Sequence, residues 1–411
     1  MESVRQAFRL LRAHKARSVL TLFGLVWGTA AVIFLVGWGA GVKTMVTNGF
    51  NKTGKNMGQM WAGRIGEEYT PAVDRRELWF TWQDIQHVRR RARIAELVGT
   101  EKRRYLPVTA GQKAVNVEVR GVEIVSQQIR SLPLAAGRGI SHADLDHRRR
   151  VAVLGADART DLLGPGSRLG DRLRIDGKNF EVVGFLDRVG TQFGRDGEEV
   201  DDQVWIPLTT HLAFWPMEWT DDDVVSFLLY RMPHRDLAEE TEAELRRILA
   251  DRIHVSPTDD EAIVGWSPVK TLRMIPLDQQ DGLMFALSAA TLVIGGIGVL
   301  NMMLDSVRQR RREIGIRLAI GARRRDVLLQ FFLETLTIVA FGGGLGVALG
   351  VGGCLALEAL ALPDLIPVPE LSFGVLAMAL GTMGGVGLVA GLVPAWMASR
   401  IDPALTLRAE G

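Results

Sequence analysis

Arginine is concentrated in one short stretch of this 411-residue chain, and guanidinium groups pair with carboxylates and phosphates. The stretch runs from Ser306 to Leu329, reads SVRQRRREIGIRLAIGARRRDVLL and holds eight arginines in two blocks around a small apolar core. This pattern is typical of a helix lying flat at the inner surface of a membrane. Two interpretations are open: the stretch only orients the chain in the membrane, or it also binds a cytosolic partner.

Residues that would form an enzyme site are missing from the sequence. It has no phosphate-binding G-x-x-x-x-G-K-[ST], no H-E-x-x-H and no G-x-S-x-G. His142 and His147, beside Asp144 and Asp146, predict a solvated turn rather than a metal site, and the single cysteine, Cys354, excludes a disulfide framework. We therefore expect no catalytic, cofactor-binding or metal site on this chain. The net charge of +2 gives no indication of nucleic-acid binding.

Four long apolar runs must position the arginine stretch, and each is long enough to cross a membrane as a helix. The first is too long for a cleaved signal peptide and lacks a small-x-small cleavage site, so we expect an uncleaved span. The predicted transmembrane helices cover residues 18–42, 282–305, 327–360 and 372–397.

Basic residues next to these spans predict the orientation of the chain. They gather in an amphipathic segment at 1–17, in the arginine segment 306–326 and in the tail 398–411, whereas the loop 361–371 has no lysine or arginine. By the positive-inside rule both termini and the arginine segment are cytoplasmic. The large segment 43–281 then lies outside the cytoplasm.

That large segment has the alternating, β-branched runs and turn signals of an α+β domain. Val115–Arg120 alternates apolar and polar residues, Asp176-Gly177 is typical of a hairpin turn, and His234–Ile253 is an amphipathic helix. The predicted fold class is therefore an α-helical membrane protein with four transmembrane helices and a large extracytoplasmic α+β domain inserted between helices 1 and 2.

Small residues predict where the spans pack closely, because glycine lets helix backbones approach one another. The third and fourth spans are rich in spaced glycines. Those we expect at helix contacts are Gly342, Gly346, Gly350, Gly381 and Gly385.

An aromatic cluster, Phe214-Trp215-Pro216-Met217-Glu218-Trp219, lies in the α+β segment. Trp215 and Trp219 have two open interpretations, a contact for a periplasmic partner or core packing beneath a loop.

Four segments in order resemble the MacB/FtsX-type permease subunits of ABC transporters. They are the opening AFRLLRAHKARSVLTLFGLVWGTAAVIFLVGWGAG, the α+β pieces VRGV, LPLAAGRGIS, VAVLGADARTDLLG, GDRLRIDGKNFEVVGFL and DDQVWIPLTT, the stretch RRREIGIRLAIGARRRDVLLQFFLET, and the ending GLVPAWMASRIDPALTLRAE. The third segment is the most specific.

The resemblance implies a permease in the bacterial inner membrane that transmits ATP binding and hydrolysis to its periplasmic domain, without an ATPase site of its own. ATP would be used by a separate cytosolic ABC ATPase. The resemblance also implies a second permease copy, the same chain or a paralogue, and a membrane fusion protein with an outer-membrane channel as further candidate partners. The residues it implies for ATPase coupling are Arg312, Glu313, Gly315, Arg317, Gly321 and Ala322.

The expected function is export of a substrate from the periplasm or outer leaflet. Two alternatives stay open at this point, a lipoprotein-releasing permease and an FtsX-like regulator of cell-wall hydrolases that transports nothing. No motif in the sequence identifies the substrate.

Overall fold

The computed structural model describes residues 15–52, 54–69, 76–194, 199–217, 223–360, 362–363 and 365–402, with side chains from residue 22 onward. The chain forms two compact units, one of Met1–Met45 with Pro276–Gly411 and one of Val46–Ile275. The predicted amphipathic segment 1–17 and the tail 398–411 fall largely outside the described residues.

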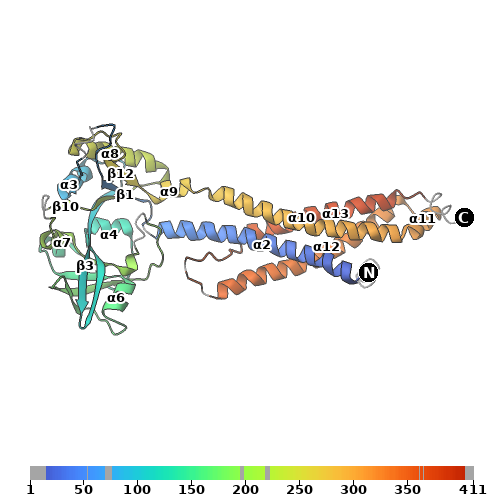
Figure 1. The fold of residues 1–411 in the computed structure, drawn as a ribbon, viewed down its shortest axis with the longest axis horizontal. Helices are drawn as coiled ribbons and strands as arrows, with labels where there is room; N and C mark the ends of the chain where they lie inside the picture. The colour runs from blue at the N-terminus through green and yellow to red at the C-terminus, as the bar shows by residue number, and fades with distance from the viewer. Residues whose placement is uncertain are drawn as a thin grey trace. The chain divides into compact units, whose positions relative to one another are not determined.

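The first unit is a bundle of long helices, which Figure 1 shows running side by side. Four of its helices are long and apolar enough to cross a membrane, as the sequence predicted. The fifth, α11, is short and follows α10 after a single residue. The helices are α2 (Lys15–Asn51), α10 (Leu277–Gln309), α11 (Arg311–Ala319), α12 (Arg324–Ala359) and α13 (Phe373–Ser399).

The bundle has an apolar interior and an apolar exterior. Leu25, Leu292 and Phe331 belong to its buried core. Ile294 and Phe373, by contrast, are 70% and 88% exposed. An apolar outer surface on long helices is what a lipid environment requires, because lipid tails are as apolar as leucine.

The segment between α12 and α13 is joined to α2. The backbone N–H of Glu370 donates to the carbonyl of Gly37 at 2.8 Å, and the Thr44 hydroxyl donates to the Glu370 carboxylate at 2.7 Å. A side chain at Gly41 would collide with the carbonyl of Val368. Glycine is therefore required at Gly41 for this close approach.

The second unit is an α+β domain, and in chain order it falls between α2 and α10. Its main sheet has the strand order β12-β1-β11-β3-β4-β9-β6-β8-β5, with β7 paired to β3 and β8, while β2 and β10 form a separate pair. The strands are β1 (Met57–Ala62), β2 (Phe80–Thr81), β3 (Leu97–Ala110), β4 (Lys113–Val122), β5 (Leu134–Gly137), β6 (Val151–Leu154), β7 (Arg172–Ile175), β8 (Lys178–Leu186), β9 (Val204–Pro207), β10 (Val224–Val225), β11 (Phe227–Arg231) and β12 (Ile263–Trp266).

Local sequence explains much of this sheet. The predicted hairpin at Asp176-Gly177 joins β7 and β8, and both turn residues have positive φ, 47° and 77°, as a type I′ turn requires. The pairs β4–β9 and β6–β8 are parallel and join strands distant in the sequence, so no turn signal predicts them.

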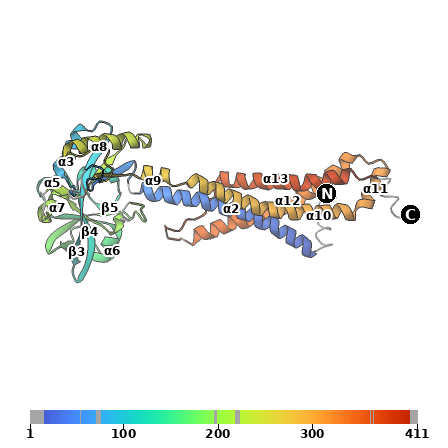
Figure 2. The same ribbon diagram turned by 45° about the horizontal axis from the view of Figure 1, so that its top comes forward.

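Helices cover the sheet over four buried apolar clusters, of which two are large. Near β1 and β11 lies a core that includes Tyr230, Leu245 and Ile85, where α3 and α8 lie next to each other (Figure 2). A second core, which includes Val119 and Phe180, lies beneath the far half of the β3–β4 hairpin. The helices are α3 (Trp82–Arg91), α4 (Ile124–Arg130), α5 (His142–Asp146), α6 (Ala156–Leu162), α7 (Leu208–Phe214), α8 (Ala238–Ile253) and α9 (Pro268–Met274), with 3₁₀ turns η2 (Val200–Asp202) and η3 (Arg235–Leu237).

Candidate functional site

Helix α11 and the turn that follows it hold all six residues of the predicted coupling site. The turn ends the helix through two backbone hydrogen bonds, Gly321 N–H to the Leu318 carbonyl at 3.2 Å and Ala322 N–H to the Arg317 carbonyl at 3.0 Å. This is the Schellman arrangement, and Gly321 takes the left-handed backbone, with φ of 104°, that it requires. Gly321 and Ala322 thus fix where α11 stops and where α12 begins.

One face of α11 is buried in the bundle. Ile314 is 4% exposed and packs in the core that includes Val307, Val327 and Phe331. Gly315 is buried beside it. This packing holds α11 against the ends of α10 and α12, so the helix does not lie free at a surface.

The opposite face presents apolar and basic groups to solvent together. Ile320, in the turn, is 82% exposed, and Ile316 is 38% exposed. Together with Ile316, Ile320 forms a small exposed apolar surface beside the arginines, which makes it a candidate contact for a partner molecule. Sequence reasoning missed Ile320, although an isoleucine between two arginine blocks was a usable signal.

Charged residues on α11 are partly paired within the unit. Glu313 and Arg317 form an ion pair at 2.5 Å one turn apart, and Arg317 also donates to the Gln330 side chain of α12 at 3.1 Å. Arg310, just before α11, lies 3.4 Å from the buried Glu334 carboxylate of α12. Arg312 is exposed.

The remaining arginines of the stretch leave a concentrated positive charge. Arg311, Arg323, Arg324 and Arg325 are exposed and form no ion pair with any residue that the structure describes. The surface formed by these arginines with Ile316 and Ile320 is hereafter the coupling surface. It is suited to a partner that offers carboxylates around an apolar depression.

The glycines predicted to pack helices divide into two groups. At Gly346 a Cβ would lie 2.6 Å from both Thr29 Cβ and the Val26 carbonyl, and at Gly342 it would lie 2.7 Å from a Leu25 methyl group. Gly350 is similarly close to Ile33, with 3.0 Å to its Cβ. All three thus line a close contact between α12 and α2.

The other two predicted glycines have no such contact in the chain. A Cβ at Gly381 or Gly385 would meet no described atom within 4 Å. On α13 the close approaches are instead at Gly387, next to Val339, and at Gly391, next to Thr335. A packing role for Gly381 and Gly385 stays a prediction about a contact outside this chain.

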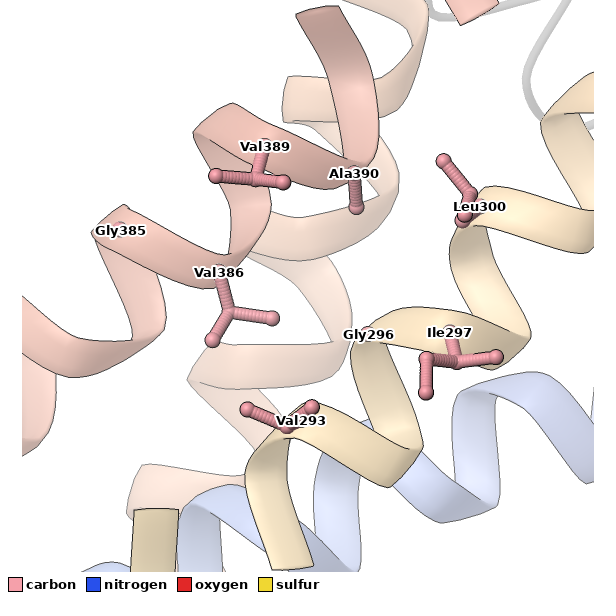
Figure 3. A pocket seen from close by; sticks show the side chains of 8 residues that line it. All are labelled: Val293, Gly296, Ile297, Leu300, Gly385, Val386, Val389 and Ala390. Atoms are coloured by element: carbon pink, nitrogen blue, oxygen red, sulfur yellow. The ribbon is translucent and has the colours of Figure 1, made fainter. Parts of the chain in front are cut away.

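Gly385 instead lines an apolar groove between α10 and α13 (Figure 3). The groove has a volume of about 250 Å³. Its lining carries no charged side chain, so it offers nothing to orient a polar ligand. The lining residues are Val293, Gly296, Ile297, Leu300, Gly385, Val386, Val389 and Ala390.

Of the two interpretations left open for Trp215, its surroundings in the structure favour core packing. Trp215 is 4% exposed, stacks on Phe180 with ring centroids 6.4 Å apart and donates its indole N–H to Asp176 at 2.8 Å. This bond lowers the pKa of the Asp176 carboxyl. Core packing, the alternative interpretation, accounts for Trp215, while Trp219 lies outside the described residues.

A buried charge network in the α+β unit was not predicted. Glu101 and Arg120 are fully buried, and Glu101 accepts from Arg120 at 3.0 Å and from Arg130 at 2.6 Å and 2.8 Å. Arg120 also pairs with Glu118. Burial alone would raise the pKa of Glu101, but the two guanidinium groups outweigh it and hold that pKa below its usual value.

In the described part of the chain, no cluster of three or more His, Cys, Asp or Glu could hold a metal ion. The residues around His142 and His147 form the short helix α5 rather than a turn. Asp144 caps it, bound to Ser141 and Arg138. These bonds outweigh the effect of burial and lower the pKa of Asp144.

Comparison with known families accounts for both units of the chain. Residues 18–248 match the MacB-like periplasmic core domain, and residues 285–403 match the FtsX-like permease C-terminal domain. The chain belongs to the MacB-like family of ABC transporter permeases. As a member of this family with four apolar helices, it is a multi-pass membrane protein.

Similar proteins of this family are larger than the chain. The macrolide export ATP-binding/permease proteins MacB of Bdellovibrio bacteriovorus and of Azoarcus sp. are 29% and 31% identical to it, each over 100% of this chain and over 62% and 60% of their own length. The pyoverdine export ATP-binding/permease protein PvdT of Pseudomonas fluorescens is 29% identical, over 100% of this chain and 60% of its own length. The chain thus spans about three fifths of these relatives.

Two solved structures resemble part of the chain at low similarity. The extracellular domain of the transporter YknZ has 17% identity and a TM-score of 0.41, covering 52% of this chain and 100% of that domain. The periplasmic region of MacB from Actinobacillus actinomycetemcomitans has 15% identity and a TM-score of 0.42, covering 55% and 95%.

Proposed function

We propose that this chain is the permease component of an ABC transporter that exports a substrate from the periplasm or the outer leaflet of the inner membrane. It transmits ATP binding and hydrolysis by a cytosolic ABC ATPase to its α+β unit. The names of the relatives, macrolide and pyoverdine exporters, favour export over lipoprotein release or regulation of cell-wall hydrolases.

The orientation follows from charge. The coupling surface is the most basic part of the described helical unit and lies between the second and third apolar helices, so the positive-inside rule places it in the cytoplasm. Two spans lie between this surface and each terminus. Since an even number of crossings returns the chain to the same side of the membrane, both termini are cytoplasmic. The α+β unit, between the first and second spans, is periplasmic.

The single observation that carries the proposal is the construction of α11. Its inner face is packed into the helix bundle, and its outer face and the turn that follows display Ile320 among exposed arginines. A force applied to the coupling surface therefore reaches α10 and α12 directly, because tightly packed interiors transmit displacement rather than absorb it. The ATPase supplies ATP chemistry, and this chain supplies the contact and the transmission.

The proposed coupling to an ATPase also predicts the composition of the transporter. Two ATPase subunits that close on ATP present two docking sites, so a second permease copy, identical or paralogous, completes the transporter. A membrane fusion protein and an outer-membrane channel would receive a substrate exported from the periplasm.

The proposal is tested with an ABC ATPase of the same organism that copurifies with this chain, reconstituted with it in lipid nanodiscs. Ile320→Ser is the cleanest variant, because a residue 82% exposed contributes little to the fold. Glu313→Ala removes only an exposed pair one turn apart, worth about 0.3–0.5 kcal/mol to the helix. We expect both to weaken ATPase binding, Ile320→Ser by removing apolar contact area and Glu313→Ala by releasing Arg317 from the ion pair that orients it on α11. We expect both to lower permease-stimulated ATP turnover by about fivefold or more.

Arg247→Ala is the matched control, since Arg247 is an exposed arginine on α8 in the other unit. It is expected to leave binding and turnover unchanged. Full binding and stimulation by both Ile320→Ser and Glu313→Ala would reduce the arginine stretch to a topology signal and overturn the proposal.

A further inference from the structure

A carboxylate is buried where α10, α11 and α12 meet. Glu334 lies on α12 and is 1% exposed, although it stands inside a helix apolar enough to cross a membrane. Its carboxylate oxygens lie 3.4 Å and 3.5 Å from the Arg310 guanidinium. Carboxylates in such helices are rare and costly, so a buried one with a defined partner marks a functional site by default.

The partner of Glu334 occupies the only break between α10 and α11. Arg310 is the single residue between them, with φ of −97° and ψ of 9°, outside the helical range. Such a break is where two helices can bend relative to each other. The side chain at the break is thus tied to α12.

A second contact from the same face of α12 reaches the other end of α11. Gln330 lies one turn before Glu334 and accepts from Arg317 at 3.1 Å. Together the two contacts hold both ends of α11 against α12, with Ile314 buried between them. Loss of the Glu334 carboxylate would remove the ion pair that holds the Arg310 end of α11 against α12.

We propose that Glu334 is a positioning residue that locks the bend at Arg310, so that movement of α11 is passed to α12 instead of being taken up at the bend. This inference rests on the proposed function, since it assumes that the ATPase moves α11. Glu334 itself touches neither nucleotide nor substrate in this account.

The effect of Glu334 on the position of α11 is measured first on the permease alone. In a Cys354→Ala background, spin labels at Ala319→Cys on α11 and Leu349→Cys on the exposed side of α12 report the distance between the two helices. We expect Glu334→Gln to broaden the distance distribution. Glu334→Asp and the swap of Arg310→Glu with Glu334→Arg are expected to narrow it again. Glu358→Gln, which changes an exposed acid on the same helix, is the control and is expected to change nothing.

Transmission is measured next in the ATPase complex. Glu334→Gln is expected to retain ATPase binding but lose stimulated turnover by about fivefold or more. The charge swap is expected to restore turnover to within about twofold of wild type, which a merely structural loss would not allow. An unchanged distance distribution, or unchanged turnover in Glu334→Gln, overturns the inference.

The two proposals fail in different ways. If the wild-type permease neither binds nor stimulates the ATPase, the proposed function fails, whereas the label distances still show whether Glu334 locks the bend. If the wild type stimulates turnover and Glu334→Gln does so equally, only the positioning role is lost.

Discussion

Each of the two units of this permease is stabilised internally by a different kind of contact. In the helical unit, glycines such as Gly346 bring α12 against α2 with almost no side chain between them. In the α+β unit, the fully buried Glu101 and Arg120 bond across neighbouring strands. Lipid cannot drive apolar helices together, so close packing must do so, whereas a water-surrounded domain has apolar area to offset the burial of charge.

The comparison also teaches where each unit tolerates change. Where helix backbones pack closely, a larger side chain at the contact destabilises the unit, whereas a change of charge elsewhere on the helix has little effect. A buried charge network tolerates no unpaired member, whatever its volume.

Removing one charge from the buried network around Glu101 is expected to lower stability more than any other change. Glu101→Gln removes the buried charge that accepts hydrogen bonds from both Arg120 and Arg130. We expect the free energy of unfolding of the α+β unit to fall by about 3–5 kcal/mol, the usual cost of breaking a buried ion pair. Urea unfolding of the full chain in detergent, followed by tryptophan fluorescence, measures it.

The control is an exposed pair in the same unit. Glu77→Gln removes the partner of Arg64, where the two side chains are 51% and 63% exposed. Its expected cost is below about 1 kcal/mol. Equal costs for the two variants would mean that burial does not distinguish these pairs.

Added volume is expected to damage the helical unit next. Gly346→Leu forces a side chain into Thr29 and the Val26 carbonyl, and overpacking of this kind costs about 1–3 kcal/mol. Gly344→Leu is the matched control on the same helix, because a Cβ there meets nothing within 4 Å. Thermal unfolding in detergent compares them. A comparable drop in melting temperature for Gly344→Leu would show that volume is not the cause.

Acid sensitivity gives a third, smaller difference between the units. Burial, with a contribution from the Lys102 charge, lowers the pKa of His211 to about 3, from a usual 6.5. Between these values the unfolded chain binds a proton that the folded chain refuses, so stability is complete above about pH 6.5 and falls as the pH drops, by up to about 1.4 kcal/mol per pH unit.

The variant that tests this keeps the ring. His211→Phe preserves an aromatic group against Trp215, whose ring centroid lies 5.4 Å away, but cannot titrate. We expect wild type to lose about 1 kcal/mol more than His211→Phe between pH 7 and pH 5.5. Carboxylates titrate equally in both proteins and cancel in the comparison. Parallel pH profiles of unfolding would contradict the shifted pKa.

Sequence reasoning worked where the signal is local. Length and hydropathy were enough for the four apolar helices, and Asp176-Gly177 was enough for the β7–β8 hairpin, since both depend on neighbouring residues. In the candidate site, the helix end at Gly321 was not predicted, although a glycine after a helical stretch is a local signal for it. The arginine stretch itself was visible as composition.

What the sequence could not supply depends on partners far along the chain. Glu101 and Arg130 read as surface charges until the fold brings them together, and nothing near Trp215 indicates that Phe180 covers it. The burial of Glu334 beside Arg310, 24 residues away, likewise depends on the fold. Pairing of this kind is a tertiary property and has no periodic signal.

The smallest expected effect concerns the glycines without a contact. Gly385→Ala adds a methyl group to the groove between α10 and α13, where no described atom lies within 4 Å. In a detergent-solubilised monomer we expect a gain of up to about 1 kcal/mol, because alanine favours the helix more than glycine does. If another permease copy packs on this face in the membrane, the same methyl group weakens that contact. Thermal unfolding of the monomer and crosslinking between copies in membranes separate the two effects. A loss of stability in the monomer would show that Gly385 already packs within its own chain, as Gly346 does.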